Sequence, residues 1–156
     1  MKKNLLSLLA ASLLTASLTP VVSAAEISKK PNVNELISPQ ATSGWSNQGG
    51  YDCRVYTDRS GSYPVSDDYI GVTAEKKQTG AAYYHITLWK QENGTENQKA
   101  EERGTFSTSA NVKFKIDSFQ DRNSQATYKV RFSLFQCGNW DGTLGQWTTD
   151  EFTVVN

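Results

Sequence analysis

The runs of alternating apolar and polar residues constrain this chain more than any other feature of its sequence. One run begins the last thirty residues, 127–156, where polar residues separate four apolar ones: Tyr128, Val130, Phe132 and Leu134. A period of two places one set of side chains on the buried face of a β-strand and the other set in water. A later run puts Phe152 and Val154 on one face. The two runs predict a long β-hairpin around a glycine-rich tip, 138–147.

Further β-like runs precede this hairpin, and turn-forming residues separate them. They are residues 51–57, 69–77, 82–91, 103–107 and 111–119. Between two of them, Asn93-Gly94 predicts a two-residue hairpin turn, and a helical turn across 97–104 is the competing interpretation. About seven strands in roughly 110 residues, with no helix between them, predict an all-β fold, an antiparallel two-sheet sandwich. Small barrels and jelly rolls satisfy the same pattern.

The run 82–91 differs from the others because both of its faces carry aromatic rings. One side holds Tyr84, Ile86 and Leu88, and the other holds Tyr83, His85, Thr87 and Trp89. A strand with only one buried face alternates more cleanly than this. The run therefore predicts either a central strand or a strand that carries a surface site.

The segment 111–132, NVKFKIDSF-QDRNSQA-TYKVRF, joins two strand patterns through a polar loop, and Tyr128 opens the second. It resembles the turn between the fifth and sixth strands of immunoglobulin-like domains, where a tyrosine begins the sixth strand. The resemblance implies an immunoglobulin-like sandwich. The cysteine departs from that pattern, because Cys137 stands nine residues after Tyr128 rather than two.

The N-terminal residues predict export of the protein. Lys2 and Lys3 precede an apolar run, 5–18, and Val22-Ser23-Ala24 supplies the small residues that a signal peptidase reads. We therefore expect a signal peptide over 1–24, a flexible leader or propeptide over 25–44, and a folded domain over 45–156. The protein is expected to be secreted. No other apolar stretch has the length of a membrane span, so none is expected in the mature chain.

Export gives meaning to the two cysteines of the chain. Cys53 and Cys137 are the only pair, and an oxidising compartment favours a disulfide between them. Residue parity places Cys137 on the outer face of its strand unless a bulge near Gln136 reverses it. We therefore expect the bridge at the end of the sandwich, where it ties the first strand to the base of the hairpin.

Charge and motif content argue against several classes of function. The chain has 16 basic and 16 acidic side chains, a balance that does not favour nucleic-acid binding. His85 is the single histidine and no nucleophile motif surrounds it, so we expect no enzymatic activity. A hydrolase that uses an unidentified carboxylate pair is an alternative. No cofactor or metal site is expected, although Asp67-Asp68 or Asp141 offers oxygen ligands for calcium.

The aromatic residues give the strongest indication of a binding function. The tip of the hairpin sets tryptophans beside short polar residues, as a surface that stacks on sugars or contacts a protein requires. The predicted ligand-binding residues are Asn139, Trp140, Asp141, Trp147, Tyr63 and Trp89. We expect a secreted, non-catalytic binding protein whose partner is an extracellular glycan, a cell-envelope polymer or a protein. A secreted antagonist, such as a bacteriocin, toxin or hydrolase inhibitor, is one alternative. In another, the tip folds back and its tryptophans cap the end of the sandwich, so that they form no binding surface.

Overall fold

The computed structural model describes residues 41–59, 62–121 and 123–156 of the chain. The predicted signal peptide, 1–24, and most of the predicted leader lie outside these residues. Within the described part, residues that were assigned to the leader contact the sandwich: Thr42 bridges Tyr56, and the Ala41 carbonyl accepts a hydrogen bond from the Thr57 amide at 3.0 Å. No helix among the described residues has the length and apolar character needed to cross a membrane.

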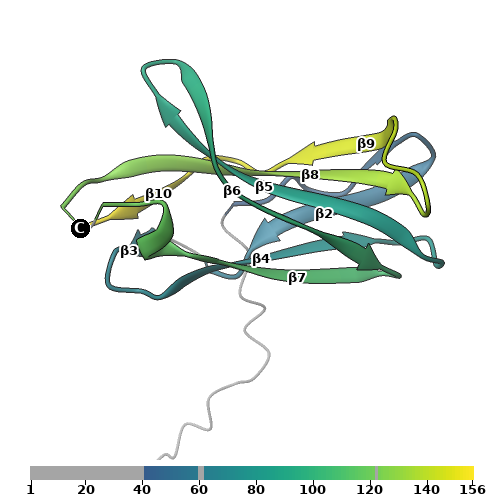
Figure 1. The fold of residues 1–156 in the computed structure, drawn as a ribbon, viewed down its shortest axis with the longest axis horizontal. Coiled ribbons are helices and arrows are strands. Elements are labelled where there is room, and N and C mark those ends of the chain that lie inside the picture. The colour runs from purple at the N-terminus through teal and green to yellow at the C-terminus, as the bar shows by residue number, and fades with distance from the viewer. Residues whose placement is uncertain (1–40, 60–61, 122) are drawn as a thin grey trace, which may run out of the picture. The chain divides into compact units, whose positions relative to one another are not determined.

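The described residues form ten strands. These strands make two sheets (Figure 1). The four-stranded sheet has the order β1 (Ser46–Gln48), β2 (Tyr51–Thr57), β4 (Tyr69–Lys76) and β7 (Ser109–Lys115). The six-stranded sheet has the order β3 (Tyr63–Pro64), β10 (Phe152–Val155), β8 (Ala126–Gln136), β5 (Ala82–Glu92) and β6 (Thr95–Phe106), with β9 (Thr143–Thr148) also paired to β8. All pairs are antiparallel except β3 with β10. The two-sheet all-β prediction is confirmed, but the strand count of about seven was too low.

Side chains of the alternating runs form the core between the two sheets. From the four-stranded sheet, β2, β4 and β7 contribute Val55, Ile70, Val72, Ala74, Val112 and Phe114. From the six-stranded sheet, β5, β8 and β10 contribute Ile86, Leu88, Tyr128, Val130, Phe132, Leu134, Phe152 and Val154. Period-two patterning identified the buried face of β2, β4, β7, β8 and β10, because burial of apolar surface dominates the choice of register. For β5 the pattern left the buried face undecided.

The C-terminal hairpin is more divided than its sequence predicted. Strand β8 pairs with β9 near its end and with β10 near its start, so one long strand has two shorter partners. Between them Thr149 keeps the connection on the sheet: its amide donates to the Val130 carbonyl at 2.9 Å, and its hydroxyl accepts from the Val130 amide at 3.0 Å. Residues 143–147, predicted as loop, belong to strand β9. The glycines of the tip hid this strand, because Gly weakens a strand signal.

Strands β5 and β6 form the hairpin that Asn93-Gly94 predicted. Both residues have positive φ, 51° for Asn93 and 76° for Gly94, as the two central residues of a type I′ turn require. The alternative helical turn across 97–104 is wrong, since these residues pair with β5 along its length. In Figure 1 the tip of this hairpin stands clear of β8. Strand β5 lies between β6 and β8, which confirms the central-strand interpretation of 82–91.

The loop between β7 and β8 contains a short 3-10 helix, η1 (Ile116–Ser118), and a tyrosine that anchors it. The Tyr128 hydroxyl donates a hydrogen bond to Gln120 Oε1, and the Phe119 ring meets the Tyr128 ring edge-on at 5.4 Å. Both Tyr128 and Gln120 are buried. The tyrosine at the start of β8 thus binds the loop that precedes the strand.

The predicted disulfide between Cys53 and Cys137 is not formed, and both cysteines are free. Cys53 lies on the inner face of β2 and is completely buried. Cys137 follows the last residue of β8 in an exposed turn. A disulfide needs its two Cβ atoms directed toward each other at close range. Sequence and compartment suggested a pair, but the side chains occupy different environments.

Candidate functional site on the outer face of the six-stranded sheet

Trp147, predicted as a ligand-binding residue, is part of the core. It is 1% exposed, its ring stacks on Phe132 at a centroid distance of 5.4 Å, and its indole N–H donates to the Ser46 carbonyl at 3.0 Å. Strand β9 causes this burial, because Trp147 is paired directly with Phe132 and points to the same inner face. Trp147 cannot contact an external partner.

Tyr63 is also buried rather than available to a ligand. Its hydroxyl donates to Asp58 Oδ1 at 2.5 Å, and its ring meets Phe152 edge-on at 5.6 Å. Burial, together with the Asp58 carboxylate, raises the pKa of the Tyr63 phenol. The residue closes the end of the core beside β10.

Trp140 remains at the surface and heads an aromatic cluster. The indole is 44% exposed and stacks on Tyr83 with ring centroids 4.6 Å apart and an interplanar angle of 18°. Phe135 contacts the same indole at 5.3 Å with its ring tilted by 55°. We call Trp140, Tyr83 and Phe135 the Trp140 platform. Two other predicted residues flank it in the turn, where Asn139 Oδ1 accepts a hydrogen bond from the Asp141 amide at 2.7 Å.

The register of the sheet explains how the platform forms. Tyr83 of β5 and Phe135 of β8 are directly paired, so their side chains leave the sheet together on its outer face. The turn that follows β8 then carries Trp140 back over them. Gly138 and Gly142 make that turn possible with φ of 86° and 79°, values that other residues rarely adopt.

The middle of the same face is covered by an ordered set of charged and aromatic side chains. The Arg131 guanidinium lies 4.7 Å from the centroid of the Trp89 ring, and Trp89 Nε1 donates to Thr87 Oγ1 at 2.7 Å. The Glu96 carboxylate forms ion pairs with both Lys129 and Arg131. These contacts lower the pKa of Glu96, and the hydrogen bond from Lys129 contributes most. Trp89 therefore shares a face with Trp140, as predicted, but it is half-buried under a cation. Trp89 lies six positions after Tyr83 in β5, a distance of about 20 Å.

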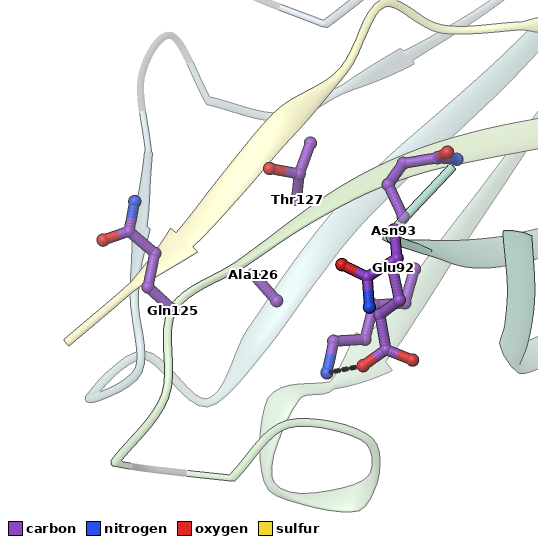
Figure 2. Close-up of a pocket in the computed structure, with 7 residues that line it drawn as sticks. Glu92, Asn93, Gln125, Ala126 and Thr127 are labelled. Atoms are coloured by element: carbon purple, nitrogen blue, oxygen red, sulfur yellow. Dashed lines mark ion pairs between the residues drawn. The ribbon is translucent and has the colours of Figure 1, made fainter. Parts of the chain in front are cut away.

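At the far end of this sheet a groove opens between β5 and β8 and takes its lining from both faces; we call it the polar wedge. Its lining comes from the end of β5 and the start of β8: Lys90, Gln91, Glu92, Asn93, Gln125, Ala126 and Thr127. Figure 2 shows Ala126 and Thr127 opposite Glu92 and Asn93. The groove has a volume of about 750 Å³. One ion pair, Lys90 Nζ to Glu92 Oε1 at 2.6 Å, crosses its floor.

A match to a known domain family covers nearly all of the described sandwich and identifies its family. Residues 39–155 match the YqgA MG2 macroglobulin domain. The chain belongs to this family. No curated protein matches the chain significantly.

His85 of the macroglobulin domain lies in an ion-pair network on the sheet face. His85 Nε2 contacts Glu101 Oε2 at 2.9 Å, and the same carboxylate accepts from Gln98 Nε2 at 2.9 Å. These contacts lower the pKa of the Glu101 carboxyl, that with His85 contributing most. Ser133 is paired with His85 across the sheet, but its hydroxyl accepts from Gln146 Nε2 at 3.0 Å. Nucleophilic catalysis requires a base bonded to the nucleophile, and no hydrogen bond between His85 and Ser133 is found in the described part of the chain.

The carboxylates considered for calcium have other partners or stand apart. The Asp67 carboxylate forms an ion pair with Arg59. The backbone carbonyl of Asp68, rather than its carboxylate, accepts a hydrogen bond from the Ile116 amide at 3.0 Å. Asp141 lies in the exposed turn beside Trp140. Among residues 41–59, 62–121 and 123–156 of the macroglobulin domain, no group of three metal-ligating side chains comes together.

Two further exposed rings lie on the four-stranded sheet side of the macroglobulin domain. Trp45 is 41% exposed, and Tyr69 is 46% exposed. Arg54 and Lys77 lie over the Trp45 ring at 4.8 and 5.0 Å, and Lys113 lies 6.0 Å from Tyr69. Cations thus already occupy positions over these rings. The Trp140 platform is the exposed aromatic surface that instead rests on other rings.

Sequence reasoning named Trp140, Asn139, Asp141 and Trp89 but missed Tyr83 and Phe135 as members of the site. The sequence did show that the run 82–91 has aromatic rings on both faces, which could have indicated Tyr83. It could not show the register between β5 and β8, which pairs Tyr83 with Phe135, 52 positions away.

Proposed function

We propose that this macroglobulin domain is an exported, non-catalytic binding module that engages a cell-envelope glycan through the Trp140 platform. The observation that carries the proposal is the position of Trp140, 44% exposed and held nearly parallel to Tyr83. Export by residues 1–24 would bring the domain to the compartment where such polymers occur.

The geometry of the stack matches the requirement for sugar binding. Tyr83 lies against one face of the indole at 4.6 Å, so the exposed area of Trp140 belongs to its other face and its edges. A flat, electron-rich ring face attracts the weakly positive C–H groups of a pyranose ring. Asn139 and Asp141, on either side of Trp140, supply polar groups that hydrogen-bond hydroxyls.

The platform is also ordered before any ligand arrives. Trp140 contacts two rings, Tyr83 and Phe135, and both are fixed by direct pairing of β5 with β8. Binding then costs little side-chain entropy, which is the advantage of preorganisation. An unsupported tryptophan on a loop would lose this advantage.

Retention on purified cell walls tests the proposal with a matched pair of variants. Trp140→Ala removes the platform ring, and Tyr69→Ala removes an equally exposed ring from the other sheet. We expect Trp140→Ala to reduce retention at least tenfold and Tyr69→Ala to leave it unchanged. Equal retention of both variants would overturn the proposal.

A protein partner is the competing ligand for the same surface, because Trp, Tyr and Arg dominate binding at protein interfaces. Cell walls stripped of protein by protease and detergent separate the two. Retention that survives the stripping supports the glycan. Retention that disappears with the protein would contradict it and identify the platform as a protein-binding surface.

A further inference from the structure

We propose that the polar wedge is a second saccharide subsite, so that the domain binds along an extended neutral glycan chain rather than at a single sugar. The inference rests on the proposed function of the Trp140 platform and adds the chemical class and the length of the ligand. Three observations support it. Part of the wedge lies on the same sheet face as the platform, β5 and β8 separate at the wedge, and the buried side-chain amide of Gln91 has no hydrogen-bond partner among the described residues.

Gln91 and Thr127 line one side of the wedge and lie on the same face of the sheet as the platform, whereas Lys90 and Glu92 alternate to the opposite face. The β5–β8 ladder runs without a register shift from the Ala82 pair to the Gln91 pair. Tyr83 and Gln91 are eight residues apart, an even number, so both point to the outer face. At about 3.3 Å per residue the two sites are roughly 26 Å apart along β5. One extended polymer, aligned with the strands, can reach both.

The wedge exists because β5 and β8 separate at this point. The last pair between them is Gln91 with Thr127. Beyond it, Glu92 pairs with Thr95 in β6, and Ala126 pairs with Val154 in β10. Each strand keeps its partner on the other side, β6 for β5 and β10 for β8, but the two strands no longer pair with each other, and their facing edges are left unbridged. A ligand group placed there meets backbone as well as side-chain polar atoms.

One lining group has a hydrogen-bonding capacity that the described chain does not use. Gln91 Nε2 is a buried donor with no hydrogen-bond partner in the described structure. A buried, unsatisfied donor costs free energy, on the order of 1–3 kcal/mol, which a ligand acceptor can recover. Thr127 is paired with Gln91 and presents its hydroxyl on the same side. Gln91 and Thr127 together give this side of the wedge a donor and an acceptor.

The charges of the wedge define the class of ligand. Lys90 and Glu92 neutralise each other at 2.6 Å, and the other polar side chains, Gln91, Asn93, Gln125 and Thr127, are neutral. Amides and hydroxyls both donate and accept, and so do the hydroxyls and acetamido groups of a sugar. An apolar ligand would leave these groups unpaired, and a strongly charged one would have to compete with the internal ion pair. A neutral saccharide satisfies the lining.

Binding of a disaccharide and a hexasaccharide of β-1,4-linked N-acetylglucosamine tests the inference by calorimetry. The wedge variant is Gln91→Met with Thr127→Val, which keeps side-chain volume while removing both polar groups. We expect the wild-type domain to bind the hexasaccharide at least tenfold more tightly than the disaccharide. The wedge variant should lose this advantage while still binding the disaccharide. Trp140→Ala should weaken both ligands.

The outcomes separate the two proposals. A wedge variant with unchanged length dependence would overturn the wedge and leave the platform intact. Loss of hexasaccharide binding by the wedge variant alone, with Trp140→Ala behaving as wild type, would support the wedge and overturn the platform. A wild-type domain that binds neither sugar contradicts both. As a second measurement, the NMR signal of the Gln91 side-chain amide should shift with the hexasaccharide, and its failure to shift would contradict the assigned contact even where the variant is unstable.

Discussion

Trp147 lies against Phe132 across the β8–β9 pair, with ring centroids 5.4 Å apart and an interplanar angle of 28°. The contact joins the C-terminal hairpin to the core, while the Trp147 N–H reaches the Ser46 carbonyl of β1 in the other sheet. One side chain thus links both sheets at the edge of the sandwich. Seven residues earlier, Trp140 is at the surface on the opposite face of the same sheet.

We predict opposite effects for the alanine variants of these two tryptophans. Trp147→Ala should lower the free energy of unfolding by about 3–5 kcal/mol, because it empties a large buried volume and leaves the Ser46 carbonyl without its donor. Trp140→Ala should cost about 1 kcal/mol or less, the value of one exposed ring stack. Chemical denaturation followed by circular dichroism measures both. Equal destabilisation would show that the platform, too, is structural.

The free cysteines predict an asymmetric reaction with thiol reagents. Cys137 is exposed and should react with a disulfide reagent such as DTNB in the native protein. Cys53 is buried, and burial raises the pKa of its thiol to about 12, so it should react only after unfolding. The expected result is one rapid thiol in buffer and two in guanidinium. No reactive thiol in non-reducing guanidinium would instead demonstrate a disulfide.

The same buried thiol predicts a loss of stability at alkaline pH. The pKa of Cys53 rises from 9.0 to about 12 on folding, so the unfolded chain releases this proton at a lower pH than the native state. Stability from this group is complete well below pH 9 and decreases as the pH rises from 9 toward 12, by roughly 1 kcal/mol between pH 8 and pH 10. The pKa of neighbouring Lys76 is lowered by burial and acts in the opposite direction.

A comparison with Cys53→Ala isolates the thiol contribution. Urea denaturation at pH 8 and pH 10 should show a smaller loss of unfolding free energy for Cys53→Ala than for the wild-type domain. Lys76 is present in both proteins, so the effect of its burial cancels in the difference, and only its interaction with the Cys53 thiolate is removed together with the thiol. An identical pH dependence of the two proteins would contradict the assignment to Cys53.

The turn between β1 and β2 offers a matched pair of glycines. Gly49 and Gly50 have φ of 56° and 83°, so alanine at either position is strained by about 1–2 kcal/mol. A Cβ on Gly49 would also overlap the Leu144 carbonyl oxygen, whereas one on Gly50 meets no atom within 4 Å. Gly49→Ala should therefore destabilise the domain more than Gly50→Ala. Thermal unfolding checks this order, and equal melting temperatures would contradict the contact between this turn and β9.

The candidate site was only partly predictable, and the reason lies in side-chain direction. The two tip tryptophans have the same sequence signal, aromatic residues among glycines and short polar residues. Strand β9 turns Trp147 inward against Phe132, while the turn before it leaves Trp140 outside. In a strand, a shift of one residue reverses the face of every side chain. No local pattern distinguishes the two, because the strand forms only by pairing with β8.

Sequence alone determined the all-β class, the buried face of the strands that alternate cleanly, such as β7 and β8, and the Asn93-Gly94 turn, because alternation and turn chemistry act between near neighbours in the chain. The tertiary structure decided which strands pair, and with that the platform of Tyr83 and Phe135, the wedge between Gln91 and Thr127, and the separate environments of the two cysteines. These depend on contacts between residues far apart in the sequence. Such contacts are selected by packing of the whole sandwich, so they appear only once both sheets are in place.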